Sequence, residues 1–354
     1  MKRVELGQSG IEVSAMCLGS MTWGTQTPIA EAHAQIEHAL AAGVDFIDTA
    51  HMYPVNPVSA GTLGRTEEII GDWFEKSGRR GEVVIATKHL GEGSGVVEGG
   101  TPMISSDTIP EAVEGSLTRL KTDVIDLYQL HWPNRGSYHF RRNWRFDPRG
   151  QDRDATEQHI ADVMGALQRE VEKGRIRAFG LSNESAWGTC QWLAAAARGQ
   201  GPRVVAMQNE YSLLCRLYDT DMAELGHNER VTLLAFSPLA TGLLSGKYQD
   251  GAVPGGSRMA VAGATGGTTD LGGRVTARVF PAVAAYLEIA RRHGIDPVHM
   301  ALAFVMQRPF PAIPIFGATT LAQLDHALGA AGVTLSDDVL DEIDAAHRAH
   351  PMPY

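Results

Sequence analysis

Short apolar runs rich in β-forming residues alternate with longer amphipathic stretches along most of the chain. Eight such runs occur, at residues 15–21, 44–50, 83–88, 124–131, 176–183, 204–210, 231–238 and 312–318. Between them, apolar positions recur at helical spacing, and many of the stretches end in Gly or a basic residue, as helix C-termini tend to do. Strand and helix alternating in this way predict parallel strands joined by crossover helices.

The number of these units favours an α/β fold of the (β/α)₈ TIM-barrel class, with residues 1–354 as a single domain. An open doubly wound sheet is the alternative. Such a sheet usually carries GxGxxG after its first strand, and this sequence has no GxGxxG. Residues 4–14 predict a β-hairpin that closes the bottom of the barrel, and residues 336–350 predict an extra C-terminal helix.

Two long connections follow predicted strands. Residues 134–154 are rich in Arg and aromatic residues, and residues 250–273 are rich in Gly. Loops of this length in a compact domain are usually functional or mobile. Because both follow strands, both are expected at the C-terminal face of the barrel, where barrel active sites lie.

Composition narrows the function classes. The net charge of −10 argues against a nucleic-acid partner. The three cysteines form no CxxC pair, so neither a disulfide framework nor a structural metal site is expected. No apolar run approaches the roughly 20 residues of a membrane span. Residues 1–10 lack the apolar core of a secretory signal, so a cytoplasmic location is expected.

Polar residues stand at the ends of three consecutive predicted strands. Asp48, Lys88 and His131 end the second, third and fourth runs, and Tyr53 follows Asp48 by five residues. A Tyr pKa of ~10 must fall by ~3 units for efficient proton donation at neutral pH, which requires ~4 kcal/mol. An ammonium at ~4 Å supplies about that much at an effective dielectric near 20. The group could therefore protonate a carbonyl oxygen while a hydride arrives at carbon.

Each of these residues alone has an ordinary structural explanation. A strand-end Asp is commonly a helix cap, a strand-end Lys is commonly solvated, a buried His is commonly hydrogen-bonded, and a loop Tyr commonly packs. Their joint occurrence on consecutive strand ends is what favours chemistry, although spacing alone leaves both interpretations open.

With these residues in place, the sequence resembles the aldo-keto reductases, and most of all the Tas-type branch related to the potassium-channel β-subunits. The similarity extends over nearly the whole chain. It is carried by "LGQSGIEVSAMCLGSMTWG", "FIDTAHMYP", "GRTEEIIGDW", "VVIATK", "SLTRLKTDVIDLYQLHWP", "GRIRAFGLSN", "QNEYSLL" and "LLAFSPLATGLLSGKY".

The resemblance implies a catalytic tetrad of Asp48, Tyr53, Lys88 and His131, with Tyr53 as the general acid. It also implies a nicotinamide cofactor whose carboxamide, ring, pyrophosphate and adenosine phosphate each have a binding segment. The cofactor-binding residues implied are Ser20, Met21, Asp48, Ser182, Asn183, Gln208, Phe236, Ser237, Pro238, Leu239, Thr241, Gly242, Lys247, Arg258, Gly317, Thr319 and Gln323.

The identity of the cofactor rests on the adenosine end. Arg258 matches a family arginine near the adenosine phosphate, which favours NADPH over NADH. Two positions depart from the family pattern: Ala327 stands where the branch usually has an adenine-contacting Asn, and Thr320 stands where an Arg or Lys is often found. These departures lower the expected affinity for the adenosine part of the cofactor, but they do not argue against its use.

The substrate pocket is less readable. Trp23, Trp132 and Trp144 are expected to line it, and the arginines of residues 134–154 either attract an anionic substrate or belong to a solvated loop. The function expected is reversible NADPH-dependent reduction of an aldehyde or ketone to an alcohol. One alternative is an NADPH-sensing interaction module with little turnover, and another is an aldolase-like barrel using Lys88 as a Schiff base. The sequence gives no indication of the physiological carbonyl or of the oligomeric state.

Overall fold

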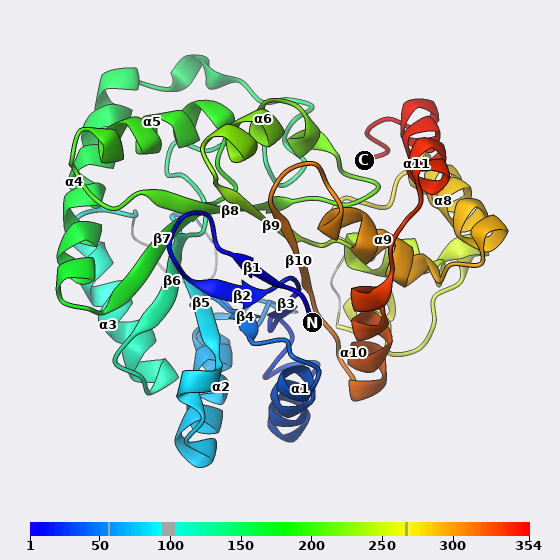
Figure 1. The fold of residues 1–354 in the computed structure, drawn as a ribbon, viewed down its shortest axis with the longest axis horizontal. Helices are drawn as coiled ribbons and strands as arrows, with labels where there is room; N and C mark the ends of the chain where they lie inside the picture. The colour runs from blue at the N-terminus through cyan, green and yellow to red at the C-terminus, as the bar shows by residue number, and fades with distance from the viewer. Residues whose placement is uncertain (56, 94–102, 266–267) are drawn as a thin grey trace.

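The computed structural model describes the whole chain except residues 56, 94–102 and 266–267. Eight parallel strands close into a barrel in the order β10-β3-β4-β5-β6-β7-β8-β9, which confirms the predicted fold class (Figure 1). Each predicted apolar run corresponds to one barrel strand, and β5 extends one residue beyond its predicted run, to His89. The strands are β3 (Cys17–Gly19), β4 (Phe46–Asp48), β5 (Val84–His89), β6 (Ile125–Leu130), β7 (Ile176–Ser182), β8 (Val204–Glu210), β9 (Thr232–Phe236) and β10 (Ala312–Phe316).

Helices cover the outside of the barrel and leave the strands buried on both sides. Every residue of β6 and β8 is buried, as expected for parallel strands with a packed lumen and covered outer face. The helices are α1 (Ile29–Ala41), α2 (Arg65–Ser77), α3 (Thr108–Leu120), α4 (Arg153–Glu172), α5 (Ala186–Ala197), α6 (Asp221–Asn228), α7 (Arg258–Ala264), α8 (Val279–His293), α9 (Pro297–Met306), α10 (Leu321–Leu328) and α11 (Asp337–Ala349).

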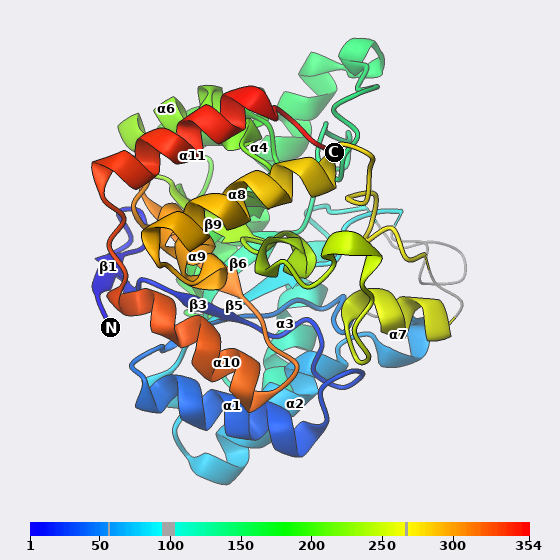
Figure 2. The same cartoon turned by 90° about the vertical axis from the view of Figure 1, so that its right-hand side faces the viewer.

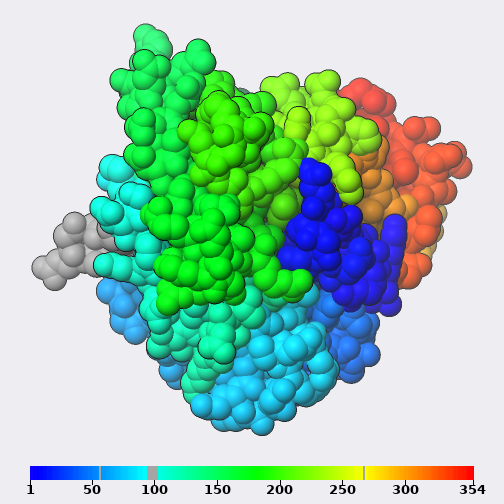
Figure 3. All heavy atoms as spheres, turned by 60° about the vertical axis from the view of Figure 1, so that its left-hand side comes forward, coloured from blue at the N-terminus to red at the C-terminus, as the bar shows by residue number. Residues whose placement is uncertain are grey.

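An antiparallel hairpin of β1 (Arg3–Glu5) and β2 (Glu12–Ser14) closes one end of the barrel, as predicted. Its inward side chains, Leu6, Ile11 and Val13, pack with lumen residues such as Phe46 and Leu127 in one apolar cluster. In Figure 3 the outer side of this dark-blue segment lies open between the green helices and the orange-to-red C-terminal part. The hairpin therefore seals the N-terminal end of the lumen and does not cover the C-terminal end.

The second long connection contains more structure than its Gly-rich composition predicts. Residues Arg258–Ala264 form α7, whose start is capped by the Ser257 hydroxyl accepting from the backbone N–H of Ala260. Figure 2 shows α7 on the side of the barrel opposite β1. Helix α11 confirms the predicted C-terminal helix. Within the described residues, no helix is both long and apolar enough to cross a membrane.

Candidate active site

The four candidate catalytic residues come from three neighbouring strands at the open end of the barrel. Asp48 is the last residue of β4, Lys88 lies next to last in β5, and His131 directly follows β6. Tyr53 lies in the connection after β4. Parallel pairing sets Asp48 beside Ala86, two residues before Lys88, and sets Lys88 beside Gln129, two residues before His131. The three positions are therefore staggered by two residues from one strand to the next. The structure thus brings together the residues that the sequence placed at strand ends.

A buried ion pair joins Asp48 to Lys88. The Lys88 ammonium donates to Oδ2 of Asp48 at 2.7 Å and to the backbone carbonyl of Thr49 at 2.8 Å, and neither charged side chain is more than 3% exposed. Burial alone would lower the pKa of Lys88, but the Asp48 carboxylate and the Tyr53 phenol more than offset it, so the pKa is raised. Lys88 is therefore held as an ammonium.

Tyr53 lies against this ammonium, at 3.5 Å from its hydroxyl to Nζ of Lys88. The sequence argument expected Lys88 to lower the pKa of Tyr53. That expectation is wrong for the net direction: burial raises the pKa of Tyr53, and the opposing effect of Lys88 does not overcome it. The expectation considered only the charge of Lys88, whereas desolvation of the Tyr53 phenolate has a larger effect on the pKa than that charge. Tyr53 is thus a protonated phenol at neutral pH.

His131 completes the group. Its ring meets the Tyr53 ring edge-on, with 6.0 Å between ring centroids. Burial, and after it the Lys88 charge, holds the pKa of His131 well below the ordinary value, so the imidazole is neutral. Its Nδ1 is buried and has no hydrogen-bond partner in the described structure. A neutral imidazole can donate one hydrogen bond to an oxygen beside Tyr53 without adding a second positive charge.

A cavity of about 600 Å³ opens over these residues. Tyr53, Asp48 and His131 line it, while Lys88 lies beneath them and is not part of the lining. Among the predicted cofactor and substrate residues, those that also line this cavity are Ser20, Met21, Ser182, Asn183, Gln208, Phe236, Ser237, Thr241, Arg258, Gly317 and Trp132. A cavity of this size suits a small organic ligand.

The polar residues at the end of β7 fit an amide ligand. Asn183 donates from Nδ2 to the His131 carbonyl at 2.9 Å, while its Oδ1 is buried without a partner in the described structure. The Asn183 backbone is left-handed, with φ 53°, an uncommon conformation that holds this side chain at the cavity. An unpaired buried carbonyl oxygen is a ready acceptor for the N–H of a carboxamide.

The segment after β9 fits phosphate. Ser237, Ala240, Thr241 and Gly242 all have positive φ, between 47° and 93°, so consecutive peptide groups turn to form a concave backbone. Such backbone nests commonly bind anions. A side chain at Gly242 would meet Nζ of Lys247 at 2.8 Å, so Gly242 leaves room for this ammonium.

Several predicted contacts lie outside the cavity. Pro238 is buried and Leu239 is half-buried, and neither lines it. Thr319 and Gln323 are bonded to each other instead, since Gln323 Oε1 accepts from both the backbone N–H and the hydroxyl of Thr319 at 3.0 Å. Only the neighbouring Gly317 reaches the lining.

Two of the three predicted substrate-pocket tryptophans are elsewhere. Trp23 is fully buried and donates from Nε1 to Gln35 of α1 at 3.0 Å, so it is a core residue and does not line the main cavity. Trp144 is 53% exposed and lines a neighbouring surface cavity, with the Arg278 guanidinium 5.1 Å from its ring. Trp132 does line the main cavity, and it packs on Gly91, where a side chain would lie 2.3 Å from its Nε1.

Sequence reasoning missed Gln129. Its Nε2 donates to Oδ1 of Asp48 at 3.2 Å, beside the Gln208 amide, which donates to the same oxygen at 2.8 Å. Both oxygens of the buried carboxylate are therefore satisfied. The sequence feature that could have identified Gln129 is a polar residue inside the apolar run "VIDLYQL", at a position that faces the barrel lumen. Gln208, expected to hold a carboxamide, also serves this carboxylate.

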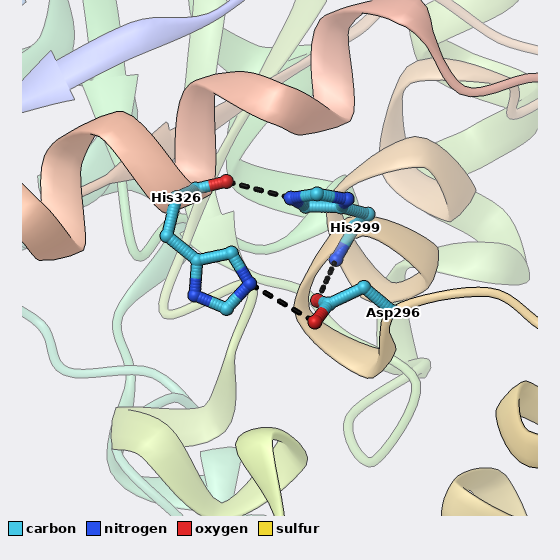
Figure 4. A group of neighbouring side chains, drawn as sticks. All are labelled: Asp296, His299 and His326. Atoms are coloured by element: carbon cyan, nitrogen blue, oxygen red, sulfur yellow. Dashed lines mark hydrogen bonds and ion pairs between the residues drawn. The ribbon is translucent and has the colours of Figure 1, made fainter.

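A second polar group, away from the cavity, could hold a metal ion. Asp296, His299 and His326 offer one oxygen and two nitrogens within 4.8 Å of one another (Figure 4). The Asp296 carboxylate caps α9 and also lies 3.0 Å from Nε2 of His326, while His299 hydrogen-bonds to the His326 carbonyl at 2.6 Å. These contacts fasten α10 to the start of α9. The sequence predicted no metal site, because the third residue is distant along the chain.

The comparisons with known proteins agree with this geometry. Residues 15–348 match the aldo/keto reductase family. Protein tas of Escherichia coli is 41% identical over 358 residues, covering 100% of this chain and 99% of that protein. An uncharacterized oxidoreductase, YrpG, of Bacillus subtilis is 30% identical over 96% of this chain and 94% of its own. A probable voltage-gated potassium channel subunit beta of Arabidopsis thaliana is 29% identical over 99% and 98%. The chain therefore belongs to the aldo/keto reductase family.

Proposed function

We propose that this protein reduces the carbonyl group of an aldehyde or ketone to an alcohol, using NADPH, with Tyr53 as the proton donor. The observation that carries the proposal is the Tyr53 phenol, 3.5 Å from a Lys88 ammonium that Asp48 keeps charged, at the floor of a cavity of about 600 Å³. Membership in an oxidoreductase family supports the same reaction class. The substrate is a small molecule, and the expected location is the cytoplasm.

The nicotinamide cofactor, when bound, supplies a hydride to the carbonyl carbon. Tyr53 gives its proton to the carbonyl oxygen, and the Lys88 ammonium stabilises the phenolate that remains. Neutral His131 donates a hydrogen bond to the same oxygen and orients the carbonyl. Water regenerates the phenol after the product leaves.

The cofactor would be held by groups that line the cavity on its other side. Asn183 and Ser182 suit the carboxamide, the left-handed segment at Ser237–Gly242 suits the pyrophosphate, and Arg258 suits the 2′-phosphate of NADPH. Burial, followed by repulsion from Arg274, lowers the pKa of Arg258 to about 10, and an anion beside it would reverse that effect. This is why NADPH is favoured over NADH.

The test compares the wild type with Tyr53→Phe, following the loss of NADPH absorbance with 4-nitrobenzaldehyde and several ketones. The variant should bind NADPH normally, and its turnover should fall by about 10²–10⁴-fold, the usual contribution of a positioned acid. Undiminished turnover in Tyr53→Phe would remove Tyr53 from the acid role.

A second candidate function is a cofactor-sensing interaction module. The similarity to a potassium channel subunit beta favours it, as does the raised pKa of Tyr53, which weakens the phenol as an acid. Tight NADPH binding with negligible turnover in both the wild type and Tyr53→Phe would support this candidate. The Schiff-base alternative requires a neutral Lys88, which the Asp48 ion pair opposes.

A further inference from the structure

The mouth of the active-site cavity is strongly basic in a protein of net charge −10. The main cavity shares residues 136, 137, 141 and 142 with a surface cavity of about 720 Å³ formed by residues 135–147. We call the arginines that line the two cavities the arginine mouth: Arg135, Arg141, Arg142, Arg145, Arg258 and Arg274. The described acidic residues that line them are Asp48, Glu92 and Asp147.

Internal ion pairs neutralise only part of this charge. Arg135 is paired with Glu184, and Asp147 is engaged by Arg149. A single buried carboxylate, Glu210, serves two arginines, at 2.9 Å from Arg141 and 2.8 Å from Arg274. Glu210, Arg141 and Arg274 together therefore carry one net positive charge.

Two members of the arginine mouth carry no such partner. Arg142 and Arg145 are exposed, and their guanidinium groups make no ion pair with the described residues. Guanidinium groups at a concave rim bind carboxylate and phosphate oxygens by paired hydrogen bonds. They also raise the local concentration of anions near the opening.

The connection that bears these arginines is held in an unusual shape. Phe140 and Arg141 are consecutive non-Gly residues in the left-handed region, with φ 57° and 64°. Such conformations are strained for non-Gly residues and persist where the surroundings enforce them, commonly at functional sites. Arg141 lies against Gly272 and Gly273, where an added side chain would be 3.4–3.5 Å from its guanidinium group. The connection is thus fixed across the cavity to the segment after α7.

The chain positions separate this region from the expected cofactor site. Arg142 and Arg145 belong to the connection that follows His131 and Trp132, after β6. The left-handed segment suited to phosphates follows β9. Arg142 lines the main cavity together with Trp132 and Phe140, and Arg145 lines the adjoining surface cavity. The two free arginines therefore lie along the route by which a carbonyl substrate would reach Tyr53 and His131.

We propose that the carbonyl substrate carries a carboxylate or phosphate group, which Arg142 and Arg145 bind at the cavity mouth while Tyr53 addresses the carbonyl. This inference rests on the proposed reductase function and adds the substrate class to it. Arg141, anchored on Glu210, positions the connection rather than binding the anion itself.

The experiment compares 4-carboxybenzaldehyde with 4-nitrobenzaldehyde, which differ in charge but little in size. The wild type should show a higher kcat/KM for the carboxylate substrate, and added salt should reduce that preference. Arg142→Gln combined with Arg145→Gln should lower the preference for the carboxylate substrate about tenfold, through a higher KM. A tenfold change corresponds to about 1.4 kcal/mol of binding free energy for the two arginines together. Turnover of the neutral aldehyde and the Kd of NADPH should not change.

The matched control is Arg153→Gln. Arg153 lies at the end of the same connection, at the start of α4, and its side chain is 75% exposed, but it lines neither cavity and pairs with Glu157, which lines neither. An unchanged preference in the double variant would overturn the proposal. So would an equal loss for both aldehydes, and so would a weakened NADPH affinity, which would assign these arginines to the cofactor.

A binding measurement separates this proposal from the proposed function. Calorimetry with 4-carboxybenzaldehyde in the presence of NADP⁺, which cannot reduce it, reports the anion site without turnover. Weaker binding to the double variant than to Arg153→Gln would support the anion site even if no aldehyde were reduced. Equal binding to both variants would reject the anion site even if reductase activity were found.

Discussion

At the scale of single residues, Asp48 organises the candidate active site. It is 2% exposed, yet it is paired with Lys88 and accepts hydrogen bonds from the amides of Gln129 and Gln208. Replacing a buried ion pair by apolar residues is often neutral or stabilising, so stability alone does not account for this pair. A buried lysine whose pKa is raised by a specific carboxylate beside a cavity is typical of catalytic sites. We therefore attribute the Asp48–Lys88 pair to the chemistry of Tyr53.

We predict that His89, the residue after Lys88 in β5, makes the free energy of unfolding depend on pH. His89 is 3% exposed, and burial lowers its pKa to about 4 although hydrogen bonds to Leu90 and Thr108 oppose the shift. In the unfolded chain the imidazole takes up a proton near its ordinary value of about 6.5. Between these values the unfolded state binds more protons, so the free energy of unfolding should fall as pH drops from about 6.5 to about 4. The His89 share of that loss is about 3 kcal/mol at most.

His89→Gln should therefore lose less stability than the wild type over this range, although it starts from a lower value at pH 7. Urea unfolding at several pH values measures the difference. The same exchange at the exposed His227 serves as the control and should leave the pH dependence as it is in the wild type. Parallel curves for His89→Gln and the wild type would show that His89 is not buried as a neutral imidazole.

At the scale of elements, the barrel strands could be predicted because each is a short apolar run followed by a helical pattern. The ends of β4, β5 and β6 fixed the positions of Asp48, Lys88 and His131, since parallel strands end at one face. Positions in irregular connections could not be predicted in this way. Trp23 stands beside the site in sequence, but its side chain turns outward to Gln35, a contact that no periodicity encodes. Helix α7 could not be predicted, because the sequence around it is rich in Gly.

The hairpin at the closed end offers a paired test of element packing. Gly7 and Gly10 both have positive φ, 63° and 72°, in the turn between β1 and β2. A side chain at Gly7 would lie 2.5 Å from the Val205 carbonyl oxygen, whereas one at Gly10 would meet nothing within 4 Å. Gly10→Ala should cost only the conformational strain, about 1 kcal/mol. Gly7→Ala should cost about 1–3 kcal/mol more, because the hairpin must shift away from the lumen.

The free energy of unfolding of both variants, measured in urea, checks this prediction. Both should keep NADPH binding, because the hairpin packs on the lumen residues at the N-terminal end of the barrel, whereas the cavity lies at the C-terminal ends of the strands. Equal costs for the two substitutions would mean that the hairpin does not press on β8 as closely as the structure indicates.

At the scale of the whole molecule, the cavity depends on elements from the entire barrel. Its lining includes residues that follow β3, β4, β5, β6, β7, β9 and β10, together with Gln208 of β8 and Arg258 at the start of α7. A ligand that contacts so many segments binds the folded state and not the unfolded chain, so its affinity adds directly to stability. This linkage gives a readout of cofactor choice that needs no substrate.

NADPH should accordingly raise the Tm of the protein more than NADH at the same concentration. A ligand present at 100 times its Kd adds about 2.7 kcal/mol to the free energy of unfolding, which corresponds to a rise of several degrees in Tm. Because Arg258 is the residue suited to the 2′-phosphate, Arg258→Gln should reduce the NADPH shift to that of NADH and leave the NADH shift unchanged. Tyr53→Phe should keep the full NADPH shift, since the proposed role of the phenol is to act on the substrate. Equal shifts for the two cofactors in the wild type would contradict the assignment of Arg258, whereas no shift with either would contradict the use of a nicotinamide cofactor at this site.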